Sequence, residues 1–399
     1  MRDQPLSKPS SPPSPAVTMG YGHQWIQEDD IAAVVRVLKS DWLTQGPLVH
    51  RFEEAIASTC GAKHAVAFSS GTAALHAACV SAGLEAGDEA ITTPMTFVAT
   101  ASAVIHSGGR PVFADIQADT LAIDPAEIRQ RLTRRTKALL PVDFAGLPPD
   151  LDAIQKIAAE HGLVVIEDAA HALGAKYRGR KVGSLSHMTV LSFHPVKTIT
   201  TGEGGVVLTD NKDLYDRLRT FRHHGILRDP TRLTRDDGPW YYEIHDLGHN
   251  FRMTDFQCAL GLSQLGKLDG FLERRRQIAA RYTQAFREFS EIILQTEPPT
   301  STSAYHLYVI QLDTDRLRCS RREIYDALRA KRIGVGVHYV PVHYHPFYQR
   351  RFGYRPGDYP RAERYYSRAI TLPLFPAMTD EDVEYVVEAV QEVVSRARR

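Results

Sequence analysis

Seven short apolar runs alternate with longer helical segments between residues 64 and 209, and this alternation restricts the fold more than any other feature of the chain. The runs read HAVAFS, EAITTP, RPVFADI, KALLPVD, LVVIEDA, MTVLSF and GGVVLTD. Several are apolar at almost every position, which is typical of strands buried on both faces of a parallel sheet. The pattern predicts an α/β domain with a mostly parallel seven-stranded sheet, whose ligands bind at the carboxyl ends of the strands.

The segments outside this region suggest a second, smaller domain. A long helical pattern covers residues 255–289, and from about residue 290 the rhythm changes to strand, helix and strand, with helix-start signals at Ser320 and Thr379. We expect a disordered Pro/Ser-rich tail over residues 1–20, a large domain over 21–289 and a smaller C-terminal α/β domain over 290–399. Near the N-terminus, one predicted helix carries an apolar stripe formed by Ile31, Val34, Val35 and Leu38.

The net charge and the cysteine content indicate which partners and which cellular compartment are expected. The formal net charge is +1, so neither nucleic acid nor a membrane surface is expected as a partner, whereas a small anionic ligand is compatible with it. No apolar run reaches the roughly 18 residues that a membrane span needs. The four cysteines are scattered without a C-x-x-C pair, which favours a reducing compartment, and we expect a cytoplasmic protein.

Two strand ends carry residues suited to a charged ligand. In SSGTAALH, Ser70, Gly71 and Thr72 open a helical segment, where free N–H groups and the helix dipole suit a phosphate; a plain N-cap explains the same residues. In VVIEDAAHALGA, Glu167 and Asp168 end an apolar strand. A carboxylate there is costly without a cation, a metal or a ring N–H as partner, and a structural ion pair is the alternative.

Two further strand ends carry a lysine and an aromatic ring. Lys197, in SFHPVKTITTGEGGVV, precedes Gly202, Gly204 and Gly205, which we interpret as the turn into the next strand. A partly buried lysine loses proton affinity and can form a Schiff base with a carbonyl; otherwise it is a loop lysine that pairs with phosphate or solvent. Phe97, in PMTFVATASAV, either lies on an aromatic ligand or belongs to the core.

One cofactor would use all four features. Pyridoxal phosphate needs a lysine for its aldehyde and an acid beside its pyridine nitrogen. Its phosphate needs N–H and hydroxyl donors, and its ring face is usually covered. The set therefore predicts an enzyme that uses pyridoxal phosphate.

The chain resembles the DegT/StrS-type sugar aminotransferases, which are pyridoxal-phosphate enzymes of fold type I. The motifs that carry the resemblance occur in the expected order from Tyr21 onward: SDWLTQGP, SSGTAALHAA, PMTFVATASAV, EDAAHALGA, SFHPVKTITTGEGG and GHNFRMTDFQCALGLSQL. Some branches of this family replace the lysine with histidine and act as dehydratases. This chain keeps Lys197, so the resemblance implies transamination.

The resemblance also implies residue roles. Lys197 would hold the cofactor as a Schiff base and act as acid and base, and Asp168 would pair with the pyridine nitrogen. His171, at a position where the family often has glutamine, would bond the phenolic oxygen. The implied cofactor-binding residues are Ser70, Gly71, Thr72, Phe97, Asp168, His171, Ser192, Lys197 and Asn250. The implied substrate-binding residues are Tyr21, Asp41, Trp42, Leu43, Thr44, Arg252, His338 and Tyr339.

The partners follow from the same resemblance. In this family, Asn250 would reach the cofactor phosphate of the other subunit, which implies a homodimer with shared active sites. L-glutamate would donate the amino group to a nucleotide-linked keto-sugar. The stretches PVDFAGLP and GVGVHYVPVHYHPFY are most similar to the branch that aminates C4 of a UDP-linked 4-keto-6-deoxy-N-acetylhexosamine in pseudaminic acid biosynthesis.

Three other functions stay open at this point. Another nucleotide-sugar 3- or 4-aminotransferase of the same family would carry the same motifs. A non-catalytic regulator could bind pyridoxal phosphate through the same fold. A metal-dependent hydrolase would have to use His338, His343 and His345, which lack the spacing of a zinc site; we expect no metal.

Overall fold

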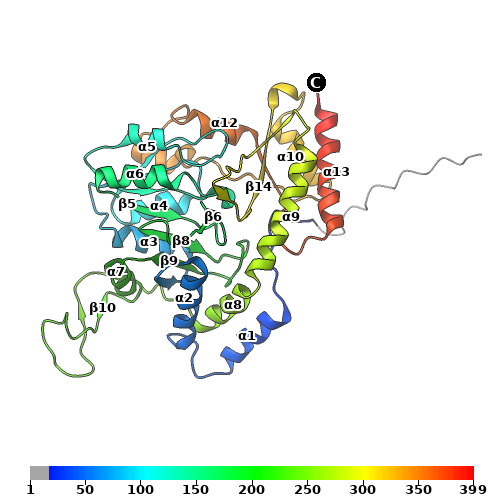
Figure 1. Ribbon diagram of the computed structural model, residues 1–399. Helices are drawn as coiled ribbons and strands as arrows, with labels where there is room; N and C mark the ends of the chain where they lie inside the picture. Colours follow the sequence, from blue (N-terminus) through cyan, green and yellow to red (C-terminus); the bar gives the residue numbers. More distant parts are fainter. Residues whose placement is uncertain (1–17) are drawn as a thin grey trace, which may run out of the picture.

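The computed structural model describes residues 18–399 (Figure 1). Of the tail expected over residues 1–20, residues 1–17 lie outside this described part. Met19 forms a parallel bridge with Ile333, and its side chain packs into the C-terminal hydrophobic core. This residue therefore belongs to the folded chain rather than to the tail.

All seven predicted runs form strands of one sheet. Its order is β1-β9-β8-β5-β4-β2-β3, and β9 runs in the direction opposite to that of the other six strands. The prediction of a mostly parallel seven-stranded sheet is therefore confirmed. The strands are β1 (His64–Phe68), β2 (Glu89–Thr92), β3 (Arg110–Phe113), β4 (Thr136–Leu140), β5 (Val164–Asp168), β8 (Met188–Ser192) and β9 (Gly205–Thr209).

Helices cover both faces of this sheet, which explains why the strands are apolar throughout. In β1, Val66 and Phe68 pack on one face, whereas Ala65 and Ala67 pack on the other. The first face is covered by α3 (Gly71–Ser81), α4 (Val98–His106) and α7 (Lys212–Arg222). The opposite face is covered by α2 (Pro47–Cys60), α5 (Pro125–Arg131), α6 (Leu151–His161) and α8 (Asp255–Leu265).

The C-terminal part has its own three-stranded antiparallel sheet, in the order β12-β14-β15. Its strands are β12 (Ile292–Leu294), β14 (Tyr308–Leu312) and β15 (Ala369–Leu372), and its helices are α10 (Arg321–Ala330), α11 (Pro346–Phe352), α12 (Pro360–Arg368) and α13 (Asp380–Ala397). Both predicted helix starts are confirmed, because Ser320 and Thr379 form capping boxes with Glu323 and Asp382.

One long helix, α9 (Leu268–Phe286), joins the two parts and runs beside α13 (Figure 1). Its first turns, including Leu272, pack in the large-domain core, and its later turns, including Tyr282, pack in the C-terminal core. A domain boundary near residue 290 stays a prediction, since α9 contributes to both cores.

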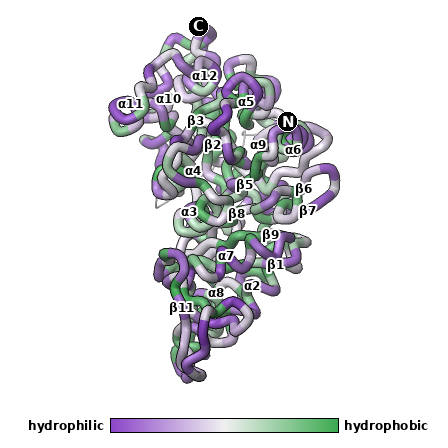
Figure 2. Tube along the Cα trace, turned by 90° about the vertical axis from the view of Figure 1, so that its left-hand side faces the viewer, coloured by the Kyte–Doolittle hydropathy of each residue, from purple (hydrophilic) through white to green (hydrophobic). Residues whose placement is uncertain are grey.

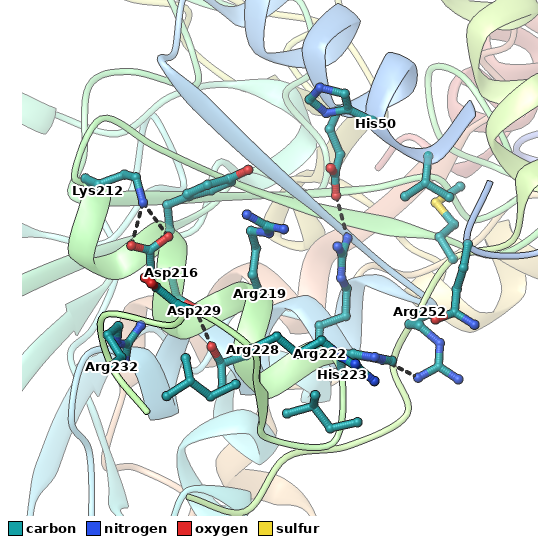
Figure 3. Close-up of a pocket in the computed structure, with 18 of the residues that line it drawn as sticks. His50, Lys212, Asp216, Arg219, Arg222, His223, Arg228, Asp229, Arg232 and Arg252 are labelled. Carbon is teal, nitrogen blue, oxygen red and sulfur yellow. Dashed lines mark hydrogen bonds and ion pairs between the residues drawn. The ribbon is translucent and has the colours of Figure 1, made fainter. Parts of the chain in front are cut away.

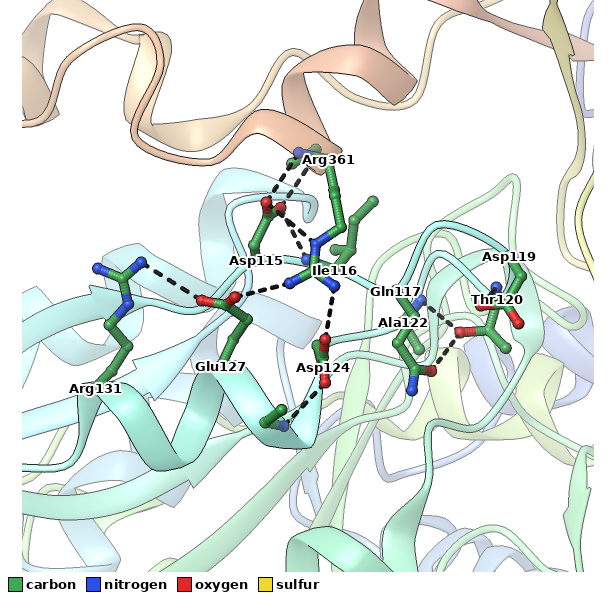
Figure 4. Close-up of polar contacts among 12 residues, drawn as sticks. Asp115, Ile116, Gln117, Asp119, Thr120, Ala122, Asp124, Glu127, Arg131 and Arg361 are labelled. Atoms are coloured by element: carbon green, nitrogen blue, oxygen red, sulfur yellow. Dashed lines mark hydrogen bonds and ion pairs between the residues drawn. The ribbon is translucent and has the colours of Figure 1, made fainter.

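An ion network also connects the two parts (Figure 4). The Arg361 guanidinium of α12 lies 2.7 Å from Asp124 and 2.8 Å from Glu127, which is on α5. Asp115, which follows β3, accepts hydrogen bonds from the backbone N–H groups of Arg361 and Ala362 at the start of α12. One carboxylate of the large domain thus caps a helix of the C-terminal part.

The first helix, α1 (Glu28–Leu38), forms where predicted, but its apolar stripe does not face the core. Ile31, Val35 and Leu38 are 47%, 40% and 57% exposed. The buried face consists instead of Asp30, Ala33 and Val37, which pack toward α8. The apolar face of α1 is therefore exposed in the single chain.

A hairpin extends away from the body of the molecule (Figures 1 and 2). It contains β10 (Ile226–Leu227) and β11 (Glu243–Ile244), which pair antiparallel, and it presents Trp240 and Leu247 at 73% and 88% exposed. A further small sheet, β13-β6-β7, is formed by β13 (Ser301–Thr302), β6 (Lys176–Tyr177) and β7 (Arg180–Lys181). Within residues 18–399, none of the helices combines the length and apolar character that crossing a membrane requires.

Candidate active site

The predicted site residues of the large domain lie at one edge of the sheet. Ser70 follows β1, Phe97 follows β2, Asp168 ends β5, and Ser192 and Lys197 lie at and after the end of β8. Strands β1 and β8 are both antiparallel to β9 and therefore run in the same direction. The carboxyl ends of the parallel strands thus bring these loops together, as expected for an α/β sheet.

The loops after β1 and β8 form a narrow cradle. A Cβ atom at Gly71 would lie 3.0 Å from the Ser192 Cβ and 3.1 Å from its Oγ. A Cβ atom at Gly205 would lie 2.6 Å from the Ser70 carbonyl oxygen. Only glycine allows these approaches. The structure therefore brings the predicted phosphate-binding residues together, with Thr72 exposed on the first turn of α3.

Ser70 has a structural role at the same position. Its Oγ accepts a 3.1 Å hydrogen bond from the Ala73 N–H and caps α3. Helix N-termini bind anions through their backbone N–H groups, so the cap and a phosphate site are compatible. The N-cap explanation is confirmed, and the phosphate site stays a prediction.

Lys197 lies on a loop whose ends are fixed. The Phe193 N–H donates to the Gly204 carbonyl (2.9 Å), and the Thr201 N–H donates to the Phe193 carbonyl (3.0 Å). Gly202 has φ +79°, which agrees with the predicted turn. Burial lowers the pKa of Lys197 to about 8, although the nearby Asp168 carboxylate opposes the shift. Roughly a tenth of this amine is therefore uncharged at pH 7, far more than for a lysine of ordinary pKa.

Asp168 and Glu167 point to opposite faces of the sheet, because neighbouring residues of a strand alternate. The Thr100 hydroxyl, from the first turn of α4, donates a 2.6 Å hydrogen bond to Asp168 Oδ2. Burial raises the pKa of Asp168, whereas the Thr100 hydroxyl, the Ala170 N–H and the Lys197 charge lower it. Thr100 lies within the PMTFVATASAV motif, but the sequence did not indicate its contact with Asp168.

Glu167 lies on the other face with a second buried acid, Asp143. Both are completely buried, and the Thr189 hydroxyl donates to Glu167 Oε2 (3.1 Å). Burial raises the pKa of both groups, and that of Asp143 is raised further by the adjacent carboxylates of Glu167 and Asp168. The ion pair considered for Glu167 is therefore wrong, because its neighbour is another carboxyl group.

An aromatic cluster surrounds this edge. Phe97, at the N-terminus of α4, is 58% exposed, so the core alternative is wrong and its ring is free to meet a ligand. The Tyr339 ring lies 6.1 Å from that of Phe97, and its hydroxyl lies 3.1 Å from His171 Nε2. Tyr21 contacts His338 at 4.7 Å between ring centroids.

The remaining predicted residues gather around the N-terminus of α8. Thr44, which ends the predicted run from Asp41 through Trp42 and Leu43, forms a bridge with Thr254. Asn250 is exposed and pairs through its backbone with His223. Arg252 donates from Nη1 to Nδ1 of the same histidine (2.7 Å). Burial lowers the pKa of His223, and the Arg252 charge lowers it further, so this ring is a neutral acceptor.

A basic pocket adjoins this second group (Figure 3). Its volume is about 780 Å³, and Lys197 is not among its lining residues. Among residues 18–399, Arg219, Arg228, Arg232 and Arg252 have no salt bridge to a carboxylate, whereas Arg222 pairs with Glu53 and Lys212 with Asp216. The basic lining residues are His50, Lys212, Arg219, Arg222, His223, Arg228, Arg232 and Arg252. The stretch RLRTFRHHGILRD carries four of these eight residues, and the sequence could have indicated this pocket through its arginines.

Two of the histidines considered for a metal site, His338 and His343, each have a different side-chain partner. His338 Nδ1 lies 2.8 Å from the Thr371 hydroxyl, and His343 Nε2 lies 2.9 Å from Glu363. In the described part of the chain, no group of three or more metal-ligating side chains is arranged to hold an ion.

The residues present at the sheet edge fit pyridoxal phosphate. At Gly71 and Ser192 the first turn of α3 approaches the Ser192 hydroxyl closely, so backbone N–H groups and a hydroxyl are available together for a phosphate. Lys197 offers an amine of reduced proton affinity, and Asp168 is a carboxyl group held by a hydrogen bond. Phe97 presents an exposed ring. Each chemical demand of the cofactor thus has a matching group.

Comparisons with known proteins agree with this site. A family model described as DegT/DnrJ/EryC1/StrS aminotransferase matches residues 24–391. The spore coat polysaccharide biosynthesis protein SpsC of Bacillus subtilis is 44% identical over 94% of this chain and 97% of its own length. The Helicobacter pylori aminotransferase PseC, involved in pseudaminic acid biosynthesis, is 34% identical, with a TM-score of 0.88 over 95% of this chain and 100% of that one.

A third similar structure bears on the cofactor. It is the pyridoxal-phosphate form of the sugar aminotransferase Spr1654 from Streptococcus pneumoniae, with a TM-score of 0.89 and 31% identity over 96% of this chain and 100% of that one.

Proposed function

Because the chain belongs to the DegT/DnrJ/EryC1/StrS family and is therefore a pyridoxal-phosphate-dependent sugar aminotransferase, we propose that it moves the amino group of L-glutamate to C4 of a UDP-linked 4-keto-6-deoxy-N-acetylhexosamine. The product would be UDP-4-amino-4,6-dideoxy-N-acetyl-β-L-altrosamine, on the route to pseudaminic acid. The observation that carries the transamination chemistry is the arrangement of Lys197, Asp168 and the Gly71–Ser192 cradle at one sheet edge. The similarity to PseC supports the choice of sugar.

The chain's residues divide the work. Lys197, with its lowered pKa, would accept the proton from the α-carbon of the donor and hold it for return during the transfer. Pyridoxal phosphate, when bound, supplies the electron sink that makes this proton removable. Asp168, fixed by Thr100, would keep a proton on the pyridine nitrogen. Ser192 and the start of α3 would hold the phosphate, and Phe97 would cover the ring.

The basic pocket supports a nucleotide-linked substrate. A sugar nucleotide carries a diphosphate, and planar guanidinium groups suit phosphate oxygens. Arg252 lies at the rim between this pocket and the Thr44 segment. We therefore assign the diphosphate to this pocket. The sugar would point toward Lys197 and toward the aromatic residues Tyr21, His338 and Tyr339.

A homodimer with shared active sites is part of the proposal. Ile31, Val35 and Leu38 present an uncovered apolar face, and the hairpin presents Trp240 and Leu247. Apolar surface of this kind favours a second copy of the chain. Asn250 is exposed beside the basic pocket. In the proposed dimer, Asn250 and the basic pocket of one chain would face Lys197 of the other chain. As the enzyme works on soluble nucleotides, we place it in the cytoplasm.

A panel assay tests the function. Purified enzyme with pyridoxal phosphate and L-glutamate is offered UDP-, dTDP- and GDP-linked 4-keto- and 3-keto-sugars, and release of 2-oxoglutarate is followed. We expect the UDP-linked 4-keto-N-acetyl sugar to give the highest kcat/KM. A higher value with another sugar would favour a different aminotransferase, an alternative that the 44% identity to SpsC keeps in view. No amino exchange with any sugar would favour a non-catalytic regulator.

A further inference from the structure

His306 packs on His171 next to the predicted cofactor site, although no pattern in the sequence marks it. It lies on the segment between β13 and β14, and its ring centroid is 4.3 Å from that of His171, with the planes tilted by 42°. The two side chains are 4% and 6% exposed. His171 also contacts Tyr339, whose hydroxyl lies 3.1 Å from Nε2. One ring and one hydrogen bond thus restrain the same imidazole.

The backbone of His306 is held from two directions. Arg275, buried on α9, donates from Nη1 to the carbonyl oxygens of Tyr305 (3.3 Å), His306 (3.3 Å) and Leu374 (3.0 Å). Gly146 has φ +100°, and a Cβ there would lie 3.0 Å from both the His171 carbonyl oxygen and the His306 nitrogen. The two histidine backbones therefore approach across a glycine and cannot shift independently.

Charge does not oppose this packing. Burial lowers the pKa of both histidines well below the usual value, and the Lys197 charge acts in the same direction on each. Two neutral rings can remain in contact, whereas two charged rings would repel.

We propose that His306 is a positioning residue, whose ring holds His171 in the orientation in which Nε2 meets the Tyr339 hydroxyl. The second side-chain torsion of histidine is broad and weakly restrained by itself. Packing against a fixed ring removes that freedom and presents His171 to the cofactor in one geometry. The consequence for turnover rests on the proposed function, whereas the orientation of His171 does not.

Two substitutions of His306 separate the ring from its nitrogens. His306→Phe keeps a planar ring and loses both nitrogens, and His306→Leu loses the ring and the nitrogens. His343→Leu is the matched control, because His343 is also buried but pairs with Glu363. The orientation of His171 is followed in ¹⁵N-histidine spectra of the protein without cofactor, and His171→Gln identifies its signals.

We expect His306→Phe to keep the native His171 signals and to retain kcat within about threefold. We expect His306→Leu to shift these signals and to lower kcat about tenfold or more at unchanged KM, because a small misplacement of a group in an active site lowers the rate strongly. If both variants behave alike, the proposal is wrong. His306→Gln, which also lacks a ring, replaces the Leu variant if that one does not fold. If the native enzyme aminates no keto-sugar, the proposed function fails, and the spectra still decide the role of His306.

Discussion

The Thr100 hydroxyl donates a hydrogen bond of 2.6 Å to Asp168 Oδ2. Thr100 belongs to the first turn of α4 and Asp168 to the last residue of β5. The bond fixes the carboxylate that we propose as the partner of the cofactor's ring, and it lowers a pKa that burial raises. The contact between α4 and β5 therefore influences the pKa of Asp168.

Removing this bond should make the enzyme more sensitive to acid. In Thr100→Val, the pKa of Asp168 rises further, so activity is lost at a higher pH as the pH falls. We expect kcat at neutral pH to fall about tenfold, the scale of a hydrogen bond to a charged group. The check is the pH profile of kcat, with Thr92→Val as control, since the Thr92 hydroxyl donates to the Leu140 carbonyl. Equal losses in both variants would contradict this role.

Replacing the lysine should abolish turnover and leave the fold intact. Lys197→Arg keeps the positive charge but has no amine that can bond covalently to the aldehyde. We expect the absorbance of the cofactor bound covalently to the native lysine to disappear. Lys181→Arg, on the exposed strand β7, should behave as native enzyme. Full activity of Lys197→Arg would contradict the assignment.

The pKa of Lys197, about 8, sets the pH dependence of cofactor uptake. The neutral amine is the reactive form, so the rate at which cofactor-free protein takes up pyridoxal phosphate should rise about fivefold from pH 7 to pH 8 and level off above pH 9. In Asp168→Asn the midpoint should move to lower pH, because the Asp168 charge favours the protonated lysine. Stopped-flow absorbance measures both midpoints. A midpoint near the ordinary lysine value would show that burial does not act as described.

Two inactive variants should restore activity when mixed. If each site combines Lys197 of one chain with Asn250 of the other, Lys197→Ala and Asn250→Ala chains form hybrid dimers with one native site. Random reassembly after mild dissociation should then recover about a quarter of native activity. Recovery is measured by 2-oxoglutarate release, with each variant reassembled alone as control. No recovery from hybrids that mass spectrometry detects would contradict shared sites.

The Arg361 network should stabilise the contact between the two parts of the chain (Figure 4). Arg361→Met leaves the Asp115, Asp124 and Glu127 carboxylates without their cation. We expect the free energy of unfolding to fall by about 1–3 kcal/mol. Urea denaturation measures this, with Arg322→Met as control, because the Arg322–Asp326 pair is largely exposed and such pairs contribute little. Similar losses in both variants would show that the network is not special.

Much of this protein could be predicted from local patterns. Continuous apolar runs identified all seven strands of the large sheet, because strands covered on both faces need apolar residues at every position. The capping residues Ser320 and Thr379 marked two helix starts correctly, since an N-cap bonds within its own first turn. Lys197, Asp168 and the Ser70–Thr72 segment were predicted as site residues because each lies at or after the end of a strand, where ligands of α/β sheets bind.

Contacts between distant segments were decided by the tertiary structure alone. The α1 stripe was predicted correctly as a helix, but only the packed chain shows that Val35 faces outward and Asp30 inward. Thr100 bonds Asp168, which is 68 residues away in the chain. His306 packs on His171, which belongs to another distant segment. Local sequence records the period and the ends of an element, whereas the neighbours of a side chain depend on how whole elements pack. The sequence by itself therefore predicted the pyridoxal-phosphate chemistry, whereas the tertiary structure decided which side chains contact Asp168 and His171 and which apolar face of α1 stays exposed.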